Sequence, residues 1–173
     1  RCHVTGRCQR RRTALRHATS GIKRMTGTQS FESVVSRQPF VVRRQVRWSD
    51  CDPAGVVYTG RFCDYVLSAN NLFYSELAQG SYRQWLKALG VDTPCKGMEF
   101  DFHGALWTED EFLISAAVNA IRKHSYDIRY EAAQADGRRI FSARVSPICI
   151  SSTGAREGVP IPDAMRARLE QFA

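Results

Sequence analysis

Two carboxylates, Asp50 and Asp52, stand in a stretch, Trp48–Tyr58, whose residue types could support attack on a carbonyl carbon. Asp52 precedes Pro53 and Gly55, a combination typical of a tight turn. A carboxylate at such a place can act as a nucleophile or as a general base that activates water. The segment before the turn alternates like a strand, and the segment after it is spaced like a helix. The turn is therefore predicted to aim Asp52 at a helix N-terminus, whose free N–H groups can stabilise an oxyanion.

An Asp-Pro turn is often purely structural, because Asp accepts a backbone hydrogen bond two residues on and Pro fixes its own φ. Three features favour chemistry here. The like charges of Asp50 and Asp52 oppose simultaneous ionisation. The turn leads into a helix, and the aromatic side chains of Trp48 and Tyr58 could shield the site from water. Cys51 is a weaker candidate nucleophile, because no His lies near it in the sequence.

The elements that must position Asp52 follow from the spacing of apolar side chains. Between residues 40 and 48, apolar and polar residues alternate with a period of two, which predicts a half-buried strand. From Gly60 the spacing becomes helical, and a helix of about five turns is predicted, with Thr59 as its N-cap and Asn70 and Asn71 on its polar face. Its apolar stripe comprises Phe62, Tyr65, Val66, Ala69, Leu72, Phe73 and Leu77.

The rest of the chain is predicted to consist mostly of strands. A shorter helix is expected over residues 82–89, ended by Gly90. Alternation then predicts strands in the regions 98–106, 112–120, 126–132 and 139–150. Asp136-Gly137 indicates a hairpin turn, and Pro147 indicates an edge position or a bulge. A short helix over residues 164–172 could close the chain. One long helix packed on an antiparallel sheet places the protein in the α+β class.

The formal net charge of +8 is concentrated at the start of the chain. Residues 1–24 contain eight of the 25 Lys and Arg side chains and no acid, and the other 17 basic residues equal the 17 acidic ones in number. We interpret this segment as upstream sequence outside the functional protein, with an Arg-rich targeting peptide and a nucleic-acid-binding arm as alternatives. Residues 25–39 are expected to be loose, and residues 40–173 to form a single domain without a nucleic-acid partner.

Several classes of protein are disfavoured by what the sequence lacks. No stretch has the roughly 20 apolar residues of a membrane span, so a cytoplasmic protein without a membrane partner is expected. The six cysteines include no Cys-x-x-Cys pair, and buried or incidental thiols are expected rather than disulfides. No His, Cys and Asp residues have the spacing of metal ligands, and no Gly-rich phosphate loop is present. Neither a metal nor a cofactor is therefore expected.

The run from Asp50 to Tyr58 resembles the motif of the 4-hydroxybenzoyl-CoA thioesterase family. That family has the hotdog fold, in which an antiparallel sheet wraps around one long central helix, and the resemblance extends over about residues 40–150. It implies an acyl-CoA thioesterase that hydrolyses an acyl- or aroyl-CoA thioester to a carboxylate and free CoA, so that coenzyme A enters only as part of the substrate.

The same resemblance assigns roles within the motif. Asp52 would be the catalytic carboxylate, acting as nucleophile or as general base, and Asp50 would support it. The backbone N–H groups of Thr59 and Gly60 would form the oxyanion hole. An apolar substrate pocket is expected from Tyr58, Phe62, Tyr65 and Phe102.

A second cluster, Arg122, Lys123 and Ser125, lies between two predicted strands. Charge runs of this kind are commonly solvated hairpin ends. In the resembling family, however, basic and hydroxyl residues here contact the nucleotide and pyrophosphate of coenzyme A, which suits the phosphate affinity of Arg and Lys.

Hotdog proteins usually assemble as dimers or tetramers, so the resemblance implies a homodimer or homotetramer. Asp52 would then come from one chain and the Arg122 region from its neighbour. A non-catalytic acyl-CoA-binding or structural oligomeric hotdog protein is the alternative, which the acidic Asp52 disfavours. Hydration or dehydration of an acyl thioester is a third option, and it would require a His such as His103 or His124.

Overall fold

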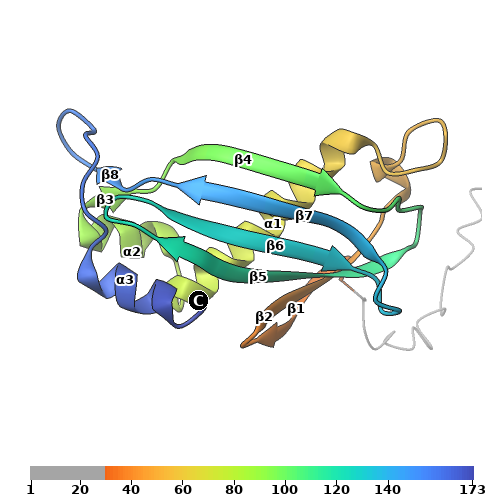
Figure 1. The fold of residues 1–173 in the computed structure, drawn as a ribbon, viewed down its shortest axis with the longest axis horizontal. Coiled ribbons are helices and arrows are strands. Elements are labelled where there is room, and N and C mark those ends of the chain that lie inside the picture. The colour runs from red at the N-terminus through yellow and green to blue at the C-terminus, as the bar shows by residue number, and fades with distance from the viewer. Residues whose placement is uncertain (1–29) are drawn as a thin grey trace, which may run out of the picture.

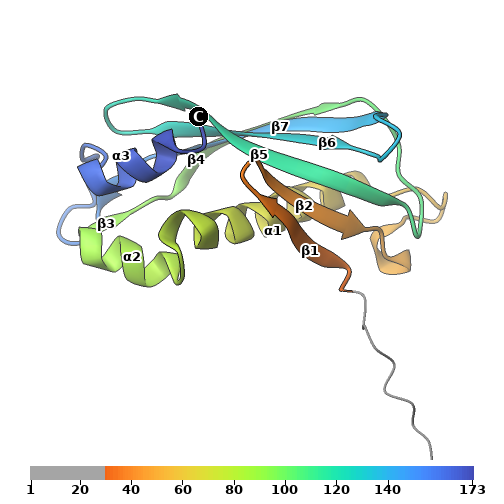
Figure 2. The same ribbon diagram turned by 90° about the horizontal axis from the view of Figure 1, so that it is seen from below.

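The computed structural model describes residues 30–173, so the basic segment 1–24 lies outside the described residues. The strands are β1 (Glu32–Arg37), β2 (Phe40–Gln45), β3 (Val91–Asp92), β4 (Cys95–Phe102), β5 (Glu111–Ile121), β6 (Tyr126–Ala133), β7 (Arg139–Pro147) and β8 (Ile150–Ser151), and the helices are α1 (Thr59–Ala78), α2 (Tyr82–Leu89) and α3 (Asp163–Glu170). Six strands form one antiparallel sheet in the order β1-β2-β5-β6-β7-β4. The sheet curves over α1, as Figures 1 and 2 show. The predicted α+β class is confirmed.

Helix α1 buries almost all of its predicted apolar stripe against the sheet. Six of its seven members are buried, and Leu72 is partly buried. Aromatic rings lock the helix to the strands: Phe73 lies 5.2 Å from Phe40 of β2, and Phe62 lies 5.6 Å from Phe141 of β7, both edge to face. Burying one such ring stabilises the fold by about 1.5–3 kcal/mol. The stripe therefore fixes the direction of α1 across the sheet.

The first strand is a difference from the prediction, since no element was expected before Phe40. Its alternation is weak because a bulge between Val34 and Ser36 shifts the register with β2, and Val35 is 53% exposed. The strand is attached by its antiparallel pairing with β2 and by a side-chain contact, in which Arg44 of β2 donates to Glu32 at 2.9 Å. The spacing of apolar residues in the sequence cannot predict an ion pair of this kind.

The segment between β2 and α1 also differs. The predicted strand ends at Gln45 rather than Trp48, and Trp48–Asp50 form one turn of 3₁₀ helix. Thr59 is the first residue of α1, and the N-cap position belongs to Tyr58, so the predicted cap is wrong by one residue. The chain therefore leaves the sheet earlier than its alternation indicates.

Two further positions have a physical explanation. The sequence predicts Asn70 on the polar face of α1, but Asn70 is buried and accepts a hydrogen bond from the Tyr130 hydroxyl at 2.6 Å. Pro147 ends an interior strand, so an edge position is wrong. The bulge alternative agrees with the structure, because the register of β4 against β7 shifts between Cys95 and Gly97, opposite Pro147.

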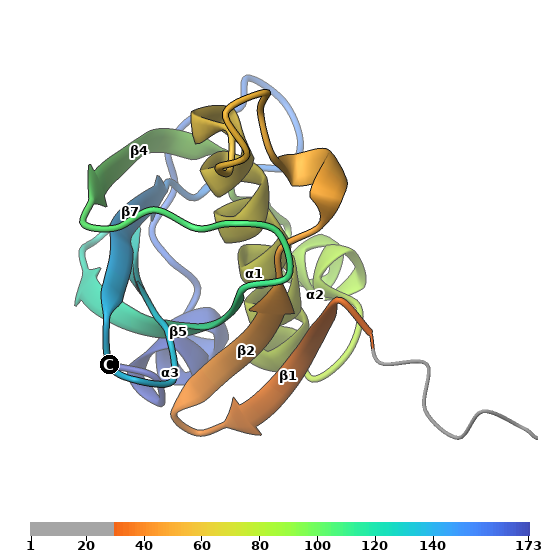
Figure 3. The ribbon, with the colours of Figure 1, turned by 90° about the vertical axis from the view of Figure 1, so that its right-hand side faces the viewer.

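Helices α2 and α3 and the small β3-β8 sheet close one end of the molecule (Figure 1). Arg168 of α3 donates to the carbonyls of Leu77 and Glu76 at 2.9 and 3.1 Å, in the last turn of α1. The Asp52 turn lies at the other end, which faces the viewer in Figure 3. None of the described helices is long and apolar enough to cross a membrane.

Candidate active site

Asp52 lies at the start of a tight turn in a small hairpin that leads into α1. Its N–H donates to the carbonyl of Val56, and the N–H of Gly55 donates to the carbonyl of Asp52, both at 2.9 Å. Gly55 has a φ of +82°, which glycine adopts without strain. Cys51 and Val57 are bridged across the hairpin. The predicted tight turn before the helix is therefore present.

One carboxylate oxygen of Asp52 is held by the turn. Its Oδ1 accepts the N–H of Ala54 at 2.8 Å, the ordinary hydrogen bond of an Asp in a turn. Its Oδ2 has no hydrogen-bond partner among residues 30–173. The half-buried side chain lines a cavity of about 680 Å³, shared with Trp48, Ser49, Cys51, Pro53, Gly55 and Thr108. One oxygen is thus oriented by the backbone while the other is left available.

Thr59 and Gly60 begin α1 directly after this hairpin. The first N–H groups of a helix have no helical carbonyl to bind, and in the described part of the chain neither of these two donates to a protein acceptor. The ring of Tyr58 lies against Gly60, where an added Cβ would stand 2.7 Å from the Tyr58 Cε1 atom. A carboxylate and two free amides are therefore presented at the two ends of one short hairpin.

Neither Cys51 nor His103 is placed to carry out the reaction in place of Asp52. Burial raises the pKa of the Cys51 thiol, and the charges of Asp50 and Asp52 raise it further. Cys51 is therefore a poor nucleophile at neutral pH. His103 contacts Ser142 and Arg139, each at 3.1 Å, and is not part of the cavity lining. Within residues 30–173, no three His, Cys, Asp or Glu side chains are grouped to hold a metal.

The two aromatic residues expected beside Asp52 are placed differently. Trp48 is 84% exposed but lines the cavity with Asp52, whereas Tyr58 is 60% exposed and is not part of that lining. Phe62 and Tyr65 belong to the buried core rather than to a pocket, and half-exposed Phe102 packs its ring 5.1 Å from Phe62. Among the residues that line the cavity, sequence reasoning missed Thr108, because the loop that carries it joins β4 to β5 and has no local pattern.

The three residues of the second cluster lie together in the turn between β5 and β6. The N–H of Arg122 donates to the carbonyl of Ser125 at 2.8 Å. The Arg122 guanidinium pairs with the buried carboxylate of Asp127 at 2.7 Å. Lys123 is exposed, and the buried hydroxyl of Ser125 accepts from Lys96 at 3.4 Å. The cluster is therefore partly fixed and partly free to meet an anion.

This cluster and Asp52 are not brought together in one chain. Arg166 of α3 donates to the carbonyl of Arg122 at 2.7 Å, and α3 is bound to the last turn of α1. Asp52 precedes the first turn of α1, and a 20-residue helix is about 30 Å long. The two regions therefore lie at opposite ends of α1.

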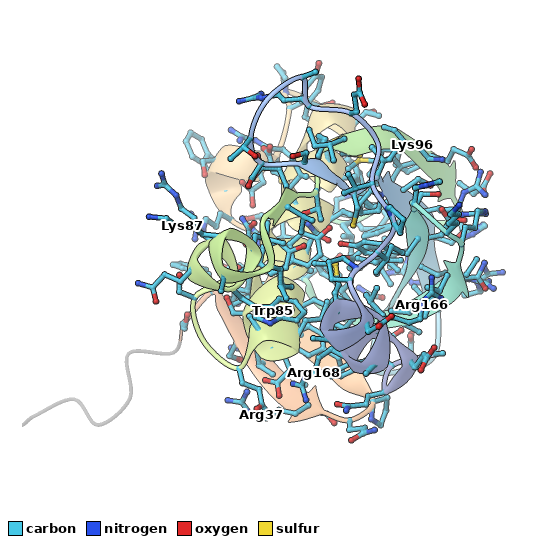
Figure 4. The ribbon with its side chains drawn as sticks, turned by 90° about the vertical axis from the view of Figure 1, so that its left-hand side faces the viewer. Arg37, Trp85, Lys87, Lys96, Arg166 and Arg168 are labelled. Atoms are coloured by element: carbon cyan, nitrogen blue, oxygen red, sulfur yellow. The ribbon has the colours of Figure 1, made fainter. Side chains whose placement is uncertain are left out.

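Further cations stand at the end that holds Arg122. Figure 4 views this end and shows Lys87, Lys96 and Arg166 on it. Sequence reasoning missed Lys96 and Arg166, because they come from β4 and α3 and only the fold brings them to the β5-β6 turn.

An antiparallel sheet wrapped around one long helix is the hotdog fold. The chain belongs to the thioesterase-like superfamily, whose family model matches residues 46–169 and so includes the Asp52 motif. The protein is accordingly a thioester hydrolase by family, as its sequence predicts.

Solved structures share this fold. One is a 1,4-dihydroxy-2-naphthoyl-CoA thioesterase from Synechocystis, with 24% identity and a TM-score of 0.66 over 75% of this chain and 94% of that chain. Another is the 4-hydroxybenzoyl CoA thioesterase from Pseudomonas sp. strain CBS-3, with 18% identity and a TM-score of 0.65 over 74% of this chain and 96% of that one. No match is found among curated proteins. At these identities the structural likeness establishes the fold.

Proposed function

We propose that the protein is an acyl-CoA thioesterase that uses Asp52 to hydrolyse an acyl- or aroyl-CoA thioester to a carboxylate and free CoA. The observation that carries this proposal is the position of Asp52. Its Oδ2 has no partner in the described chain, it lines a cavity, and its hairpin ends at the free N–H groups of Thr59 and Gly60. Superfamily membership supports the thioester class, and the names of the two solved relatives support coenzyme A.

Asp52 can act by either of two routes. As a nucleophile, its Oδ2 attacks the thioester carbon, CoA leaves as a thiolate that takes a proton from solvent, and water then cleaves the mixed anhydride. As a general base, it accepts a proton from the water that attacks the same carbon. In both routes the N–H groups of Thr59 and Gly60 stabilise the oxyanion. An acyl adduct on Asp52, found by mass spectrometry after rapid quenching, would identify the first route.

Thiol release from a panel of aliphatic and aromatic acyl-CoA substrates tests the activity. Asp52→Asn should lower kcat by at least about 100-fold, because the amide can neither attack nor accept the proton. Asp136→Asn is the matched control, since Asp136 is an exposed turn carboxylate that accepts the N–H two residues on, as Asp52 does, but lies outside the cavity lining and should leave kcat unchanged. Saturable CoA binding without turnover of any substrate would instead identify the non-catalytic alternative.

We also propose that the nucleotide of CoA binds to Arg122, Lys123 and Ser125 of a neighbouring protomer in a homodimer or homotetramer. The separation along α1 supports this, because the two regions of one chain lie at opposite ends of a helix about 30 Å long. Strand β4 supports it as well. It is an edge strand of the described sheet that runs from Lys96, beside Ser125, to Phe102, beside the first turn of α1.

Subunit complementation tests the shared site. Asp52→Asn and Arg122→Glu protomers should each be nearly inactive. After the two are unfolded together and refolded, mixed dimers should regain activity at one of their two sites. Failure of the mixture to exceed the separate variants, or a protein that sediments only as a monomer, would refute the shared site. The cytoplasmic location expected from the sequence stays a prediction.

A further inference from the structure

Asp50, two residues before Asp52, joins four segments of the chain. Its Oδ2 accepts the hydroxyl of Tyr65 at 3.0 Å and the N–H of Arg47 at 3.1 Å. Its Oδ1 lies 3.9 Å from Nε of Arg61, and its carbonyl accepts the N–H of Tyr58 at 3.0 Å. The segment before the turn, the N-cap and the first two turns of α1 are therefore all attached to one residue.

This attachment is more than a turn requires. The hairpin is already closed by the backbone bonds of Asp52 and Gly55. Asp50 is only 7% exposed, and a buried carboxylate costs free energy unless its partners compensate for lost hydration. It is also absent from the lining of the cavity that holds Asp52. Asp50 therefore holds the neighbouring segments in position and does not contact a substrate in that cavity.

A line of buried and partly buried polar groups contacts Tyr65 from the other side. The guanidinium carbon of Arg44 lies 4.3 Å from the centre of the Tyr65 ring. Arg44 donates to Glu32 of β1 at 2.9 Å, and the other oxygen of Glu32 accepts the hydroxyl of Ser68 on α1. Burial, followed by the hydrogen bond to Asp50, raises the pKa of Tyr65, so the hydroxyl keeps the proton that it donates. The line crosses from β1 over β2 to α1 and ends at the Asp50 carboxylate.

We propose that Asp50 is a positioning residue, held by Tyr65, that fixes the Asp52 carboxylate relative to the N–H groups of Thr59 and Gly60. The proposal rests on the proposed function for its kinetic consequence but not for its structural one. A carboxylate and an oxyanion hole must hold the thioester carbon between them, and a misplacement of 1 Å can cost about 100-fold in rate. The Tyr58 N–H bonded to the Asp50 carbonyl directly precedes the two amides, so a movement of Asp50 moves them relative to Asp52.

Tyr65→Phe is the sharpest test, because it removes only the hydroxyl and leaves the ring under Arg44. We expect kcat to fall about tenfold with KM within about twofold, since the cavity is unchanged while the reacting groups lose their fixed relation. Asp50→Asn should lower kcat similarly. Tyr130→Phe is the matched control, because it removes a buried hydroxyl that bonds Asn70 of the same helix but does not contact the turn. It should keep kcat within about twofold even if it lowers the melting temperature more than Tyr65→Phe does.

A double-mutant cycle separates positioning from general loosening. In the Asp52→Asn background, Tyr65→Phe should cause no further loss of the residual rate, because a residue that acts through Asp52 has nothing left to position. A further tenfold loss in that background would overturn the proposal. An unchanged kcat in the single variant Tyr65→Phe would also overturn the proposal. If the wild type were active and Asp52→Asn inactive in the same assay, that result would leave the proposed function intact.

Hydrogen exchange tests the inference even if the protein has no thioesterase activity. In Tyr65→Phe, the amides of residues 50–58 should exchange at least about fivefold faster, and those of β6 should exchange as in the wild type. Equal exchange in both regions would refute the attachment through Asp50. An inactive wild type in which the turn alone exchanges faster would refute the proposed function and support the inference.

Discussion

The pair formed by Glu32 and Arg44 is predicted to attach β1 to the sheet. Their side chains are 19% and 10% exposed, and Arg44 Nη1 lies 2.9 Å from Glu32 Oε1. Glu32→Gln removes the negative charge while preserving shape. The buried Nε of Arg44 has no hydrogen-bond partner in the described chain, so after the substitution only a neutral amide acceptor and the Tyr65 ring would compensate for burial of the guanidinium charge.

The expected magnitude follows from that burial. Removing one partner of a buried ion pair costs about 3–5 kcal/mol, because the other charge remains buried. The slight exposure of Glu32 and the retained cation–π contact reduce this, so we expect a loss of about 2–3 kcal/mol in the free energy of unfolding. With an m value of about 1.5 kcal/mol per molar urea, the midpoint should fall by roughly 1.3–2 M. A domain of ordinary stability, about 5–15 kcal/mol, would still be folded in water.

Urea unfolding, followed by tryptophan fluorescence at one protein concentration, measures the effect. Glu111→Gln is the matched control, because its partner Arg43 is the neighbouring residue of β2 and Glu111 is 48% exposed. An exposed pair contributes only about 0.2–1 kcal/mol. The variant Arg44→Met with Glu32→Gln should lose less than the sum of the two single losses, because no unpaired charge remains. Additive losses, or a midpoint for Glu32→Gln that matches the Glu111→Gln control, would refute the reasoning.

Three other predictions concern charge, burial and substrate size. The hydrogen bond from Arg122 lowers the pKa of Asp127. The stabilisation from Asp127 is therefore complete above its unfolded pKa of about 3.9 and is lost as pH falls through the lower folded pKa. Below pH 4, the urea midpoint of the wild type should decline more steeply with falling pH than that of Asp127→Asn. Tyr130→Phe should cost about 1–3 kcal/mol of unfolding free energy, because the buried amide oxygen of Asn70 loses its donor. Arg122→Ala should raise KM for acyl-CoA but not for the matching acyl-pantetheine, which lacks the nucleotide, and equal effects on both substrates would contradict a phosphate contact.

The elements that could be predicted from the sequence are those specified by local patterns. The stripe of α1 repeats at helical spacing from Phe62 to Leu77, and all of its members but Leu72 are buried. The Asp52 turn is equally local, because Pro53 and Gly55 meet its backbone requirements within a few residues. Motifs of this kind identify both the chemistry and the helix that supports it.

What could not be predicted depends on contacts between distant segments. The side-chain contact that supports β1 joins Glu32 to Arg44, across the strand pair and twelve residues later. The exposure of Trp48 follows from the end of β2 at Gln45, after which the strand period no longer decides which way a side chain points. The buried state of Asn70 depends on Tyr130, sixty residues later. The spacing of apolar residues predicts which face of an element is buried. It cannot predict that a polar side chain on that element will meet a hydrogen-bond partner from a distant segment.

The placement of the two functional regions at opposite ends of α1 has a consequence for symmetry. A two-fold axis perpendicular to the sheet at β4 would make the β4 strands of two copies antiparallel, since a self-complementary interface brings each residue opposite its counterpart in reverse order. Lys96 of one copy would then approach the Phe102 end of the other. The basic end of each protomer would then lie near the Asp52 end of its neighbour, and the two-fold axis would make these two contacts equivalent. One chain would thus supply half of each of two identical sites. For this reason subunit mixing tests the proposed function more directly than any substitution made in a single chain.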